Sequence, residues 1–241
     1  MLFIGHRGAV GIGFPENTLV AVDRALRQGA DGVEIDVRLT SDGVPVCHHD
    51  AAMRRTAGDP RQVASVRSHA LPLVQGYLIP TLSDMIDLVG DRGRLIIEMK
   101  TPGWAVGTAF GTVNAVAGVL RRHRLHDVVV SSFDRPCASA MRTLDLPVRT
   151  ALLGRPGVPL DIVVRRAMSD GHEEVHPHVS SLLARLHLLE RTGLPAISAW
   201  TVARPGDLQR NEKAGVGAAI CDDPRAARRS LGSTLVGAGQ V

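Results

Sequence analysis

The stretch that decides the fold reads "DGVEIDVRLTSDGVPVCHHD" and covers residues 31–50. Apolar residues at positions 33, 35 and 37 alternate with polar ones, which is the pattern of a β-strand with one buried face. Glu34 and Asp36 then share the opposite face, two residues apart. Two neighbouring carboxylates repel each other and are costly to bury without a partner. The pattern therefore indicates a strand whose second face forms part of a site.

Strand-like and helix-like segments alternate along the chain in about eight units of about 30 residues. Such alternation favours a parallel sheet, and eight units predict a (β/α)8 barrel, the TIM barrel. The alternative is a doubly wound open sheet, but no GxGxxG or GxxxxGK[ST] motif follows an early strand. Residues 51–79 are too many for a simple loop, so we expect a small insertion between the second strand and its helix. We predict one domain over residues 1–241.

The expected strands cover residues 2–5, 32–37, 94–98, 128–131, 148–153, 173–176, 196–200 and 217–220. The expected helices cover residues 19–28, 80–89, 106–122, 136–144, 160–168, 180–192, 207–214 and 224–231. Asn17 and Thr18 are both candidate caps of the first helix.

The composition excludes several classes of protein. Of 241 residues, 44% are hydrophobic, which is enough for a large core. A net charge of +4 with only 3% aromatic residues does not indicate nucleic-acid binding. Three widely spaced cysteines without a CxxC pattern predict reduced thiols. The sequence has no signal-peptide pattern and no apolar stretch long enough to span a bilayer, so we expect a cytoplasmic protein without stable membrane insertion. Nothing indicates the oligomeric state.

Unusual polar residues follow the expected strands at the points where they end. In a (β/α)8 barrel these ends meet at one rim, where the active site lies. Residues distant in sequence would therefore converge there. The residues concerned are His6, Arg7, Glu34, Asp36, Glu98, Lys100, Ser131, Ser132, His176, Trp200 and Asp222.

Three of these residues, Glu34, Asp36 and Glu98, carry carboxylates that would point at one spot. Three carboxylates require a cation there, and ligands that are all oxygen suit Mg²⁺ or Ca²⁺. Arg7 and Lys100 would suit a phosphate beside that metal ion. The sequence therefore predicts a site for a divalent cation and a phosphate group.

His6 and His49 are the candidate acid and base, because imidazole titrates near neutral pH. Together with the metal and the two cations they describe a site that cleaves a phosphate ester. If the strand continues through residues 46–49, neighbouring side chains diverge, so His48 points away from the site and is structural. The run "EEVHPHVS", which contains His176 and His178, is expected to be a loop with solvated imidazoles.

Over nearly its whole length the chain resembles the glycerophosphodiester phosphodiesterase family. Eight motifs occur in the family's order: "GHRG" at 5–8, "PENT" at 15–18, "GADGVEIDVRLTSDGVPV" at 29–46 with "HD" at 49–50, "IPTLSD" at 79–84, "IIEMK" at 96–100, "SSFD" at 131–134, "AWTV" at 199–202 and "DDP" at 222–224. The resemblance implies a (β/α)8 barrel, a divalent metal ion, and hydrolysis of glycerophosphodiesters to glycerol 3-phosphate and an alcohol.

The resemblance also implies a role for each matching residue. His6 and His49 would be the catalytic pair, Glu34, Asp36 and Glu98 the metal ligands, and Arg7 and Lys100 the phosphate contacts. Glu16 would hold the site together near the metal, and Trp200 would line the glycerol pocket. Two positions depart from the family pattern and bear on substrate specificity, Ala203 and Gly217.

Two other functions are alternatives to this assignment. The first is a related phosphodiesterase that acts on a lysophospholipid, for which the apolar residues 71–79 would supply an entrance. The second is a non-catalytic phosphate-binding protein on the same barrel, although such a protein would be expected to have lost a histidine or an acid. The sequence does not indicate which histidine is the acid, or whether water or the glycerol hydroxyl is the nucleophile.

Overall fold

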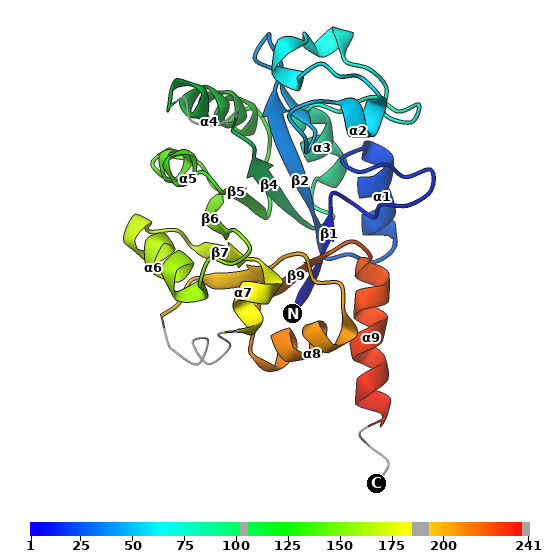
Figure 1. Cartoon of the computed structure of the whole chain (residues 1–241), viewed down its shortest axis with the longest axis vertical. Helices are drawn as coiled ribbons and strands as arrows, with labels where there is room; N and C mark the ends of the chain where they lie inside the picture. Colours follow the sequence, from blue (N-terminus) through cyan, green and yellow to red (C-terminus); the bar gives the residue numbers. More distant parts are fainter. Residues whose placement is uncertain (102–105, 185–192, 238–241) are drawn as a thin grey trace.

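A closed ring of eight parallel strands forms the centre of the molecule (Figure 1). The structure is a computed structural model and describes residues 1–101, 106–184 and 193–237. Around the ring the order is β1, β2, β4, β5, β6, β7, β8 and β9, and β1 closes the ring by pairing with both β2 and β9. The ring strands are β1 (Leu2–His6), β2 (Gly32–Leu39), β4 (Arg94–Met99), β5 (Val128–Ser132), β6 (Arg149–Gly154), β7 (Glu174–Pro177), β8 (Ala196–Ala199) and β9 (Ala218–Cys221). The predicted (β/α)8 barrel is confirmed.

Helices follow the strands and cover the outside of the ring (Figure 1). They are α1 (Leu19–Arg27), α3 (Leu82–Val89), α4 (Val106–Leu120), α5 (Arg135–Arg142), α6 (Leu160–Asp170), α7 (Val179–Leu183), α8 (Pro205–Lys213) and α9 (Pro224–Gly237). Of the helix expected over residues 180–192, the part from 185 onward lies outside the described residues.

The two faces of β2 behave as their residue types require. Val33, Ile35 and Val37 are fully buried in the same cluster as apolar residues of α1 and α3. Glu34 and Asp36 therefore face the barrel interior. The register sets His6 of β1 beside Glu34, and Asp36 beside Glu98 of β4. These parallel pairings bring four predicted site residues together without any special turn.

The insertion predicted after the second strand is present at the top of Figure 1. The chain first returns along β2 as the short antiparallel strand β3 (Pro45–Cys47). Residues 51–79 then form helix α2 (Arg54–Ala57) and two 3₁₀ turns, Val63–Ser65 and Ser68–Ala70. The insertion has a small core of its own, in which the Met53 side chain is fully buried.

A buried ionic network lies inside the barrel and corrects one expectation. His176 belongs to β7 and is 0% exposed, so it is not a solvated loop imidazole. Its Nε2 lies 3.1 Å from Glu174 Oε2, and Glu174 Oε1 lies 2.6 Å from Arg149 Nη1 and 3.5 Å from Arg94 Nη1. A polar run can therefore form an interior strand here, because charges on neighbouring strands neutralise it.

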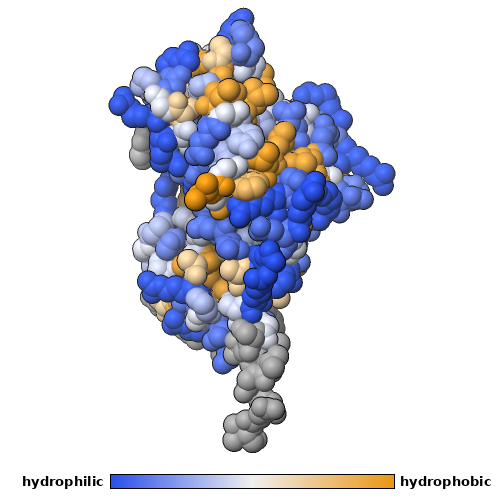
Figure 2. Space-filling view, turned by 90° about the vertical axis from the view of Figure 1, so that its right-hand side faces the viewer, coloured by the Kyte–Doolittle hydropathy of each residue, from blue (hydrophilic) through white to orange (hydrophobic). Residues whose placement is uncertain are grey.

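The surface is polar with apolar groups scattered over it. Figure 2, which views the right-hand side of Figure 1, shows orange patches between larger blue areas. The large hydrophobic residues exposed on the molecule include Ile12, Leu73 and Leu78. Across the described residues, the helices are all too short or too polar to cross a membrane.

Candidate active site

The carboxyl ends of the ring strands surround a cavity of about 800 Å³. Its lining includes the predicted residues His6, Arg7, His49, Glu98, Lys100 and Trp200. These side chains come from the ends of β1, β3, β4 and β8. The cavity therefore lies at the rim where the sequence predicted the site to be.

Glu34, Asp36 and Glu98 converge inside this rim. One carboxylate oxygen of each lies within 4.8 Å of the others, and the three residues are 5%, 1% and 6% exposed. Burial, together with the charge of Asp36, raises the pKa of Glu34 to about 8. Burial also raises the pKa of Glu98, although Lys100 opposes that effect. Three buried acids at this spacing need a positive charge in order to be ionised together.

Two cations partly supply that charge. Lys100 Nζ lies 3.0 Å from Asp36 Oδ1 and also contacts Glu98 Oε1, and Arg7 Nε lies 3.2 Å from Asp36 Oδ2. Burial acts to raise the pKa of Asp36, but Lys100 and Arg7 outweigh it and hold that pKa at about 2. Asp36 is therefore ionised at neutral pH.

The three carboxylates fit a divalent cation by their donor atoms. Asp36 Oδ1 is buried and, apart from its ion pair with Lys100 Nζ at 3.0 Å, accepts no hydrogen bond from the residues that the structure describes. An all-oxygen donor set with such an atom suits Mg²⁺ or Ca²⁺, as the sequence predicted, and does not suit a metal that prefers thiolates.

Asn17, one of the two candidate caps of α1, orients Asp36 instead. Its Nδ2 donates to Asp36 Oδ2 at 2.8 Å, and its Oδ1 accepts from the Asp36 backbone N–H at 3.0 Å. Thr18 is the actual cap of α1, because its side chain accepts from Ala21 N–H. Two adjacent residues with similar capping ability therefore have different tasks.

The two predicted catalytic histidines each contact a carboxylate through the same ring atom. Nδ1 of His6 lies 2.7 Å from Asp222 Oδ1, and Nδ1 of His49 lies 2.7 Å from Asp50 Oδ1. A carboxylate can only accept here, so each Nδ1 carries the proton when the imidazole is neutral. Nε2 is then the atom that each ring has free to exchange a proton.

The surroundings shift the pKa values of His6 and His49 in opposite directions. Burial alone would lower the pKa of His6, but the hydrogen bond with Asp222 and the charge of Glu34 raise it above its ordinary value. Burial lowers the pKa of His49, and Asp36 only partly opposes this. Separated pKa values are what an acid and base pair needs at one pH.

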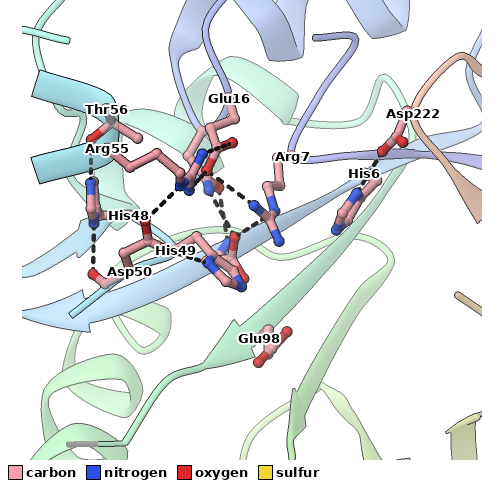
Figure 3. A network of polar contacts seen from close by, with 12 residues as sticks. His6, Arg7, Glu16, His48, His49, Asp50, Arg55, Thr56, Glu98 and Asp222 are labelled. Atoms are coloured by element: carbon pink, nitrogen blue, oxygen red, sulfur yellow. Dashed lines mark hydrogen bonds and ion pairs between the residues drawn. The ribbon is translucent and has the colours of Figure 1, made fainter. Parts of the chain in front are cut away.

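His48 is absent from the cavity lining, whereas His49 is part of it, although β3 ends at Cys47 and the strand does not continue through residues 46–49. It is 3% exposed, and its ring lies between the Asp50 carbonyl oxygen, 2.8 Å from Nδ1, and Thr56 Oγ1, 2.8 Å from Nε2 (Figure 3). His48 therefore joins the strand end to the insertion.

Glu16 lies between two arginines at the rim. Its Oε1 accepts from Arg7 Nη1 at 3.0 Å, and its two oxygens accept from Arg55 of α2 at 2.6 and 2.8 Å (Figure 3). Glu16 thus binds Arg7, and Arg7 in turn contacts Asp36, one of the three acids.

Trp200 forms part of an aromatic wall of the cavity. Its ring meets Phe133 edge-on, with 5.3 Å between the ring centroids, and its Nε1 donates to the His176 carbonyl at 2.9 Å.

Ser132 donates to the Met99 carbonyl at 2.9 Å, so it is a hydrogen-bonding rim residue and not an activated nucleophile.

Comparison with known proteins identifies the family. The model of the glycerophosphoryl diester phosphodiesterase family matches residues 6–226. The chain belongs to this family.

Relatives of the glycerophosphoryl diester phosphodiesterase family match over most of their length. The glycerophosphodiester phosphodiesterase of Caldanaerobacter subterraneus subsp. tengcongensis is 29% identical over 238 residues, which cover 92% of this chain and 94% of that protein. Two solved structures share the fold. That of the Thermotoga maritima glycerophosphodiester phosphodiesterase has a TM-score of 0.79 at 24% identity, covering 95% of this chain and 97% of its own. The structure of an Oleispira antarctica phosphodiesterase in complex with the product sn-glycerol-3-phosphate has a TM-score of 0.84 at 23% identity. The match covers 96% of this chain and 97% of that one.

Several residues of this family site were not assigned from the sequence. Asp222 was noted as a strand-end residue, but its pairing with His6 spans 216 positions and has no local signal. Arg55 contacts Glu16, 39 positions away, and was not among the residues expected in the site. Arg38 lines the cavity and its Nε donates to the His49 carbonyl oxygen at 2.8 Å. A long-range polar contact of this kind is visible only when the barrel is closed.

Proposed function

We propose that the protein hydrolyses glycerophosphodiesters to glycerol 3-phosphate and an alcohol in a metal-dependent reaction. The observation that carries this proposal is the cluster of Glu34, Asp36 and Glu98, of which Glu98 lines a cavity that two carboxylate-bound histidines also line. Family membership agrees with the reaction class.

The three acids would hold one divalent cation, Mg²⁺ or Ca²⁺. When bound, such an ion would polarise the phosphoryl oxygens and lower the pKa of a nucleophilic oxygen. Its charge would also let Glu34 ionise at neutral pH, since the raised pKa of that group comes from burial and from the neighbouring charge of Asp36.

Arg7 and Lys100 would contact the phosphoryl oxygens. Both line the cavity and both are held by carboxylates, Arg7 by Glu16 and Asp36, and Lys100 by Asp36 and Glu98. Arginine presents a planar fork and lysine a point charge, so the first would orient the phosphate and the second would offset its charge. Trp200 and Phe133 would supply an apolar wall for the glycerol carbons.

His6 and His49 would transfer the protons. One removes the proton from the nucleophile and the other protonates the leaving alcohol, each through Nε2, while Asp222 and Asp50 hold the rings at Nδ1. Each such transfer typically contributes about 10²–10⁴-fold to the rate. Because the pKa of His6 is raised and that of His49 is lowered, His6 would hold its proton to a higher pH than His49.

The lysophospholipid alternative finds no support in the cavity. Its lining residues, all in the described part of the chain, include none from residues 71–79. Leu73 and Leu78 of that segment are instead exposed on the surface, at 52% and 76%. A small, water-soluble phosphodiester is therefore the substrate that we favour.

The experiment that tests this function measures glycerol 3-phosphate released from a panel of glycerophosphodiesters, with Mg²⁺ and Ca²⁺ tried separately. Glycerophosphocholine and a lysophosphatidylcholine are compared under the same conditions by the choline that each releases, because the acylated substrate would yield a lysophosphatidate instead of glycerol 3-phosphate. We expect turnover of the glycerophosphodiester and little of the lysophospholipid. The reverse order would favour the lipid substrate, and no turnover of any diester would leave a phosphate-binding protein.

A further inference from the structure

One guanidinium on the insertion contacts two carboxylates that serve different parts of the site. Arg55 Nε donates to Asp50 Oδ2 at 2.7 Å, while its Nη1 and Nη2 donate to the two oxygens of Glu16 at 2.8 and 2.6 Å. Figure 3 shows Arg55 lying between these two acids. Three donors in one plane are therefore in use, which only arginine can offer.

Each of the two carboxylates continues to a proposed site residue. Asp50 uses its other oxygen, Oδ1, on His49 Nδ1 at 2.7 Å. Glu16 uses Oε1 on Arg7 Nη1 at 3.0 Å, and Arg7 in turn contacts Asp36. A continuous chain of contacts thus runs from His49 through Arg55 to Arg7, as Figure 3 shows.

Helix α2 is fixed on both sides of Arg55. Met53, just before the helix, is fully buried in the core of the insertion. Thr56, just after Arg55, forms a hydrogen bond with His48, and the two atoms concerned, Thr56 Oγ1 and His48 Nε2, lie 2.8 Å apart. The backbone that carries Arg55 is therefore held in place by groups other than Asp50 and Glu16.

We propose that Arg55 is a positioning residue of the active site, which fixes Asp50 behind His49 and Glu16 behind Arg7 at the same time. The insertion would then be part of the catalytic apparatus, because it couples the proton-transfer group to the phosphate-binding group. This inference rests on the proposed function of those two residues.

The strength of these contacts agrees with that role. Burial acts to raise the pKa of Glu16, but the hydrogen bonds from Arg55 and the charge of Arg7 lower it. The pKa of Asp50 is lowered well below its usual range, because Arg55 and then His49 outweigh the effect of burial. Both acids therefore stay ionised and hold their partners over the pH range in which a histidine pair works.

The kinetic test compares Arg55→Met, Arg55→Lys and the matched control Arg54→Met. Arg54 is the preceding residue of the same helix, is exposed, and forms no ion pair within the described residues. We expect Arg55→Met to lower kcat/KM by about 10²-fold, with kcat lower and KM higher, since both groups lose their orientation. Arg55→Lys keeps the charge but not the fork, so it should recover only part of the loss. Arg54→Met should behave as the wild type.

Chemical rescue separates positioning from a merely structural role. Guanidinium at millimolar concentrations, well below the denaturing range, should restore part of the activity of Arg55→Ala and none in the control Asp50→Asn/Arg55→Ala, which lacks one of the two carboxylates to bridge. Equal kinetics of Arg55→Met and the wild type would overturn the proposal. So would an equal effect of guanidinium on both variants.

A crystal structure of Arg55→Met gives a readout that needs no turnover. We expect the His49 ring and the Asp50 carboxylate to leave the positions seen here or to occupy more than one. If both superpose on the wild type, Arg55 does not position them, and the proposal fails even if the enzyme is active. If the wild type releases no glycerol 3-phosphate, the proposed function fails, and this structural comparison still decides the role of Arg55.

Discussion

The tandem histidines His48 and His49 give a prediction that separates activity from stability. Replacing one by alanine should lower mainly the activity, and replacing the other should lower mainly the stability. His49 lines the cavity and its ring is held by Asp50, whereas His48 lies buried between Asp50 and Thr56. His49→Ala should therefore lose activity and keep its stability. His48→Ala should keep most of its activity and lose stability.

The size of each effect follows from these contacts. Removing one proton-transfer group typically costs about 10²–10⁴-fold in kcat, or about 2.7–5.4 kcal/mol of barrier. His49 is 33% exposed at its side chain with one side-chain hydrogen bond to Asp50, so its removal should cost less than about 1 kcal/mol of stability. His48 is 3% exposed with two hydrogen bonds at about 0.5–1.5 kcal/mol each, so its loss should cost about 1–3 kcal/mol. For a domain of this size that lowers Tm by about 2–12 °C.

The assay measures kcat for glycerophosphodiester hydrolysis at saturating metal, together with Tm, for His48→Ala, His49→Ala, His6→Ala and the His6→Ala/His49→Ala double variant. The double variant should lose much less than the product of its two single losses, because groups that act as a unit are not additive. An active His49→Ala beside an inactive, stable His48→Ala would refute the strand register and the assignment of the second catalytic histidine.

Two further predictions concern the groups around the acids. Lys100→Met should raise KM for the diester, since a phosphate contact is lost. The metal concentration for half-maximal activity should stay equal or fall, because Lys100 Nζ no longer lies against Asp36 and Glu98. A clear rise in that concentration would mean that Lys100 supports metal binding instead. Asp222→Asn should move the pH-rate limb that belongs to His6 to lower pH, because the hydrogen bond to Asp222 is what raises the pKa of His6 against the effect of burial; a profile measured between pH 5 and 9 that matches the wild type would contradict this pairing.

Much of the site could be predicted because it depends on two regular features. In a parallel barrel the strand ends share one rim, and within a strand alternate residues share one face. The convergence of Glu34, Asp36 and Glu98 follows from these features alone and does not depend on how the loops run. The position of His49 at the cavity does depend on the loop, because β3 ends at Cys47.

The residues that were misjudged or missed all depend on contacts between distant segments. Asn17 has the sequence signal of a helix cap, yet it bonds Asp36, 19 positions away. His176 was expected to be solvated, yet it is buried beside Glu174, whose other partners Arg94 and Arg149 come from β4 and β6. The local pattern carries no information about which charge on another strand will meet a given side chain.

The most direct test of the central claim is glycerol 3-phosphate release before and after removal of divalent metal. The arrangement of Glu34, Asp36 and Glu98 predicts that exhaustive chelation with EDTA abolishes activity and that Mg²⁺ or Ca²⁺ restores it. Glu98→Gln should need a higher metal concentration for the same activity, and should show a smaller metal-induced rise in Tm than the wild type. Full activity of the chelated wild-type protein would contradict the account.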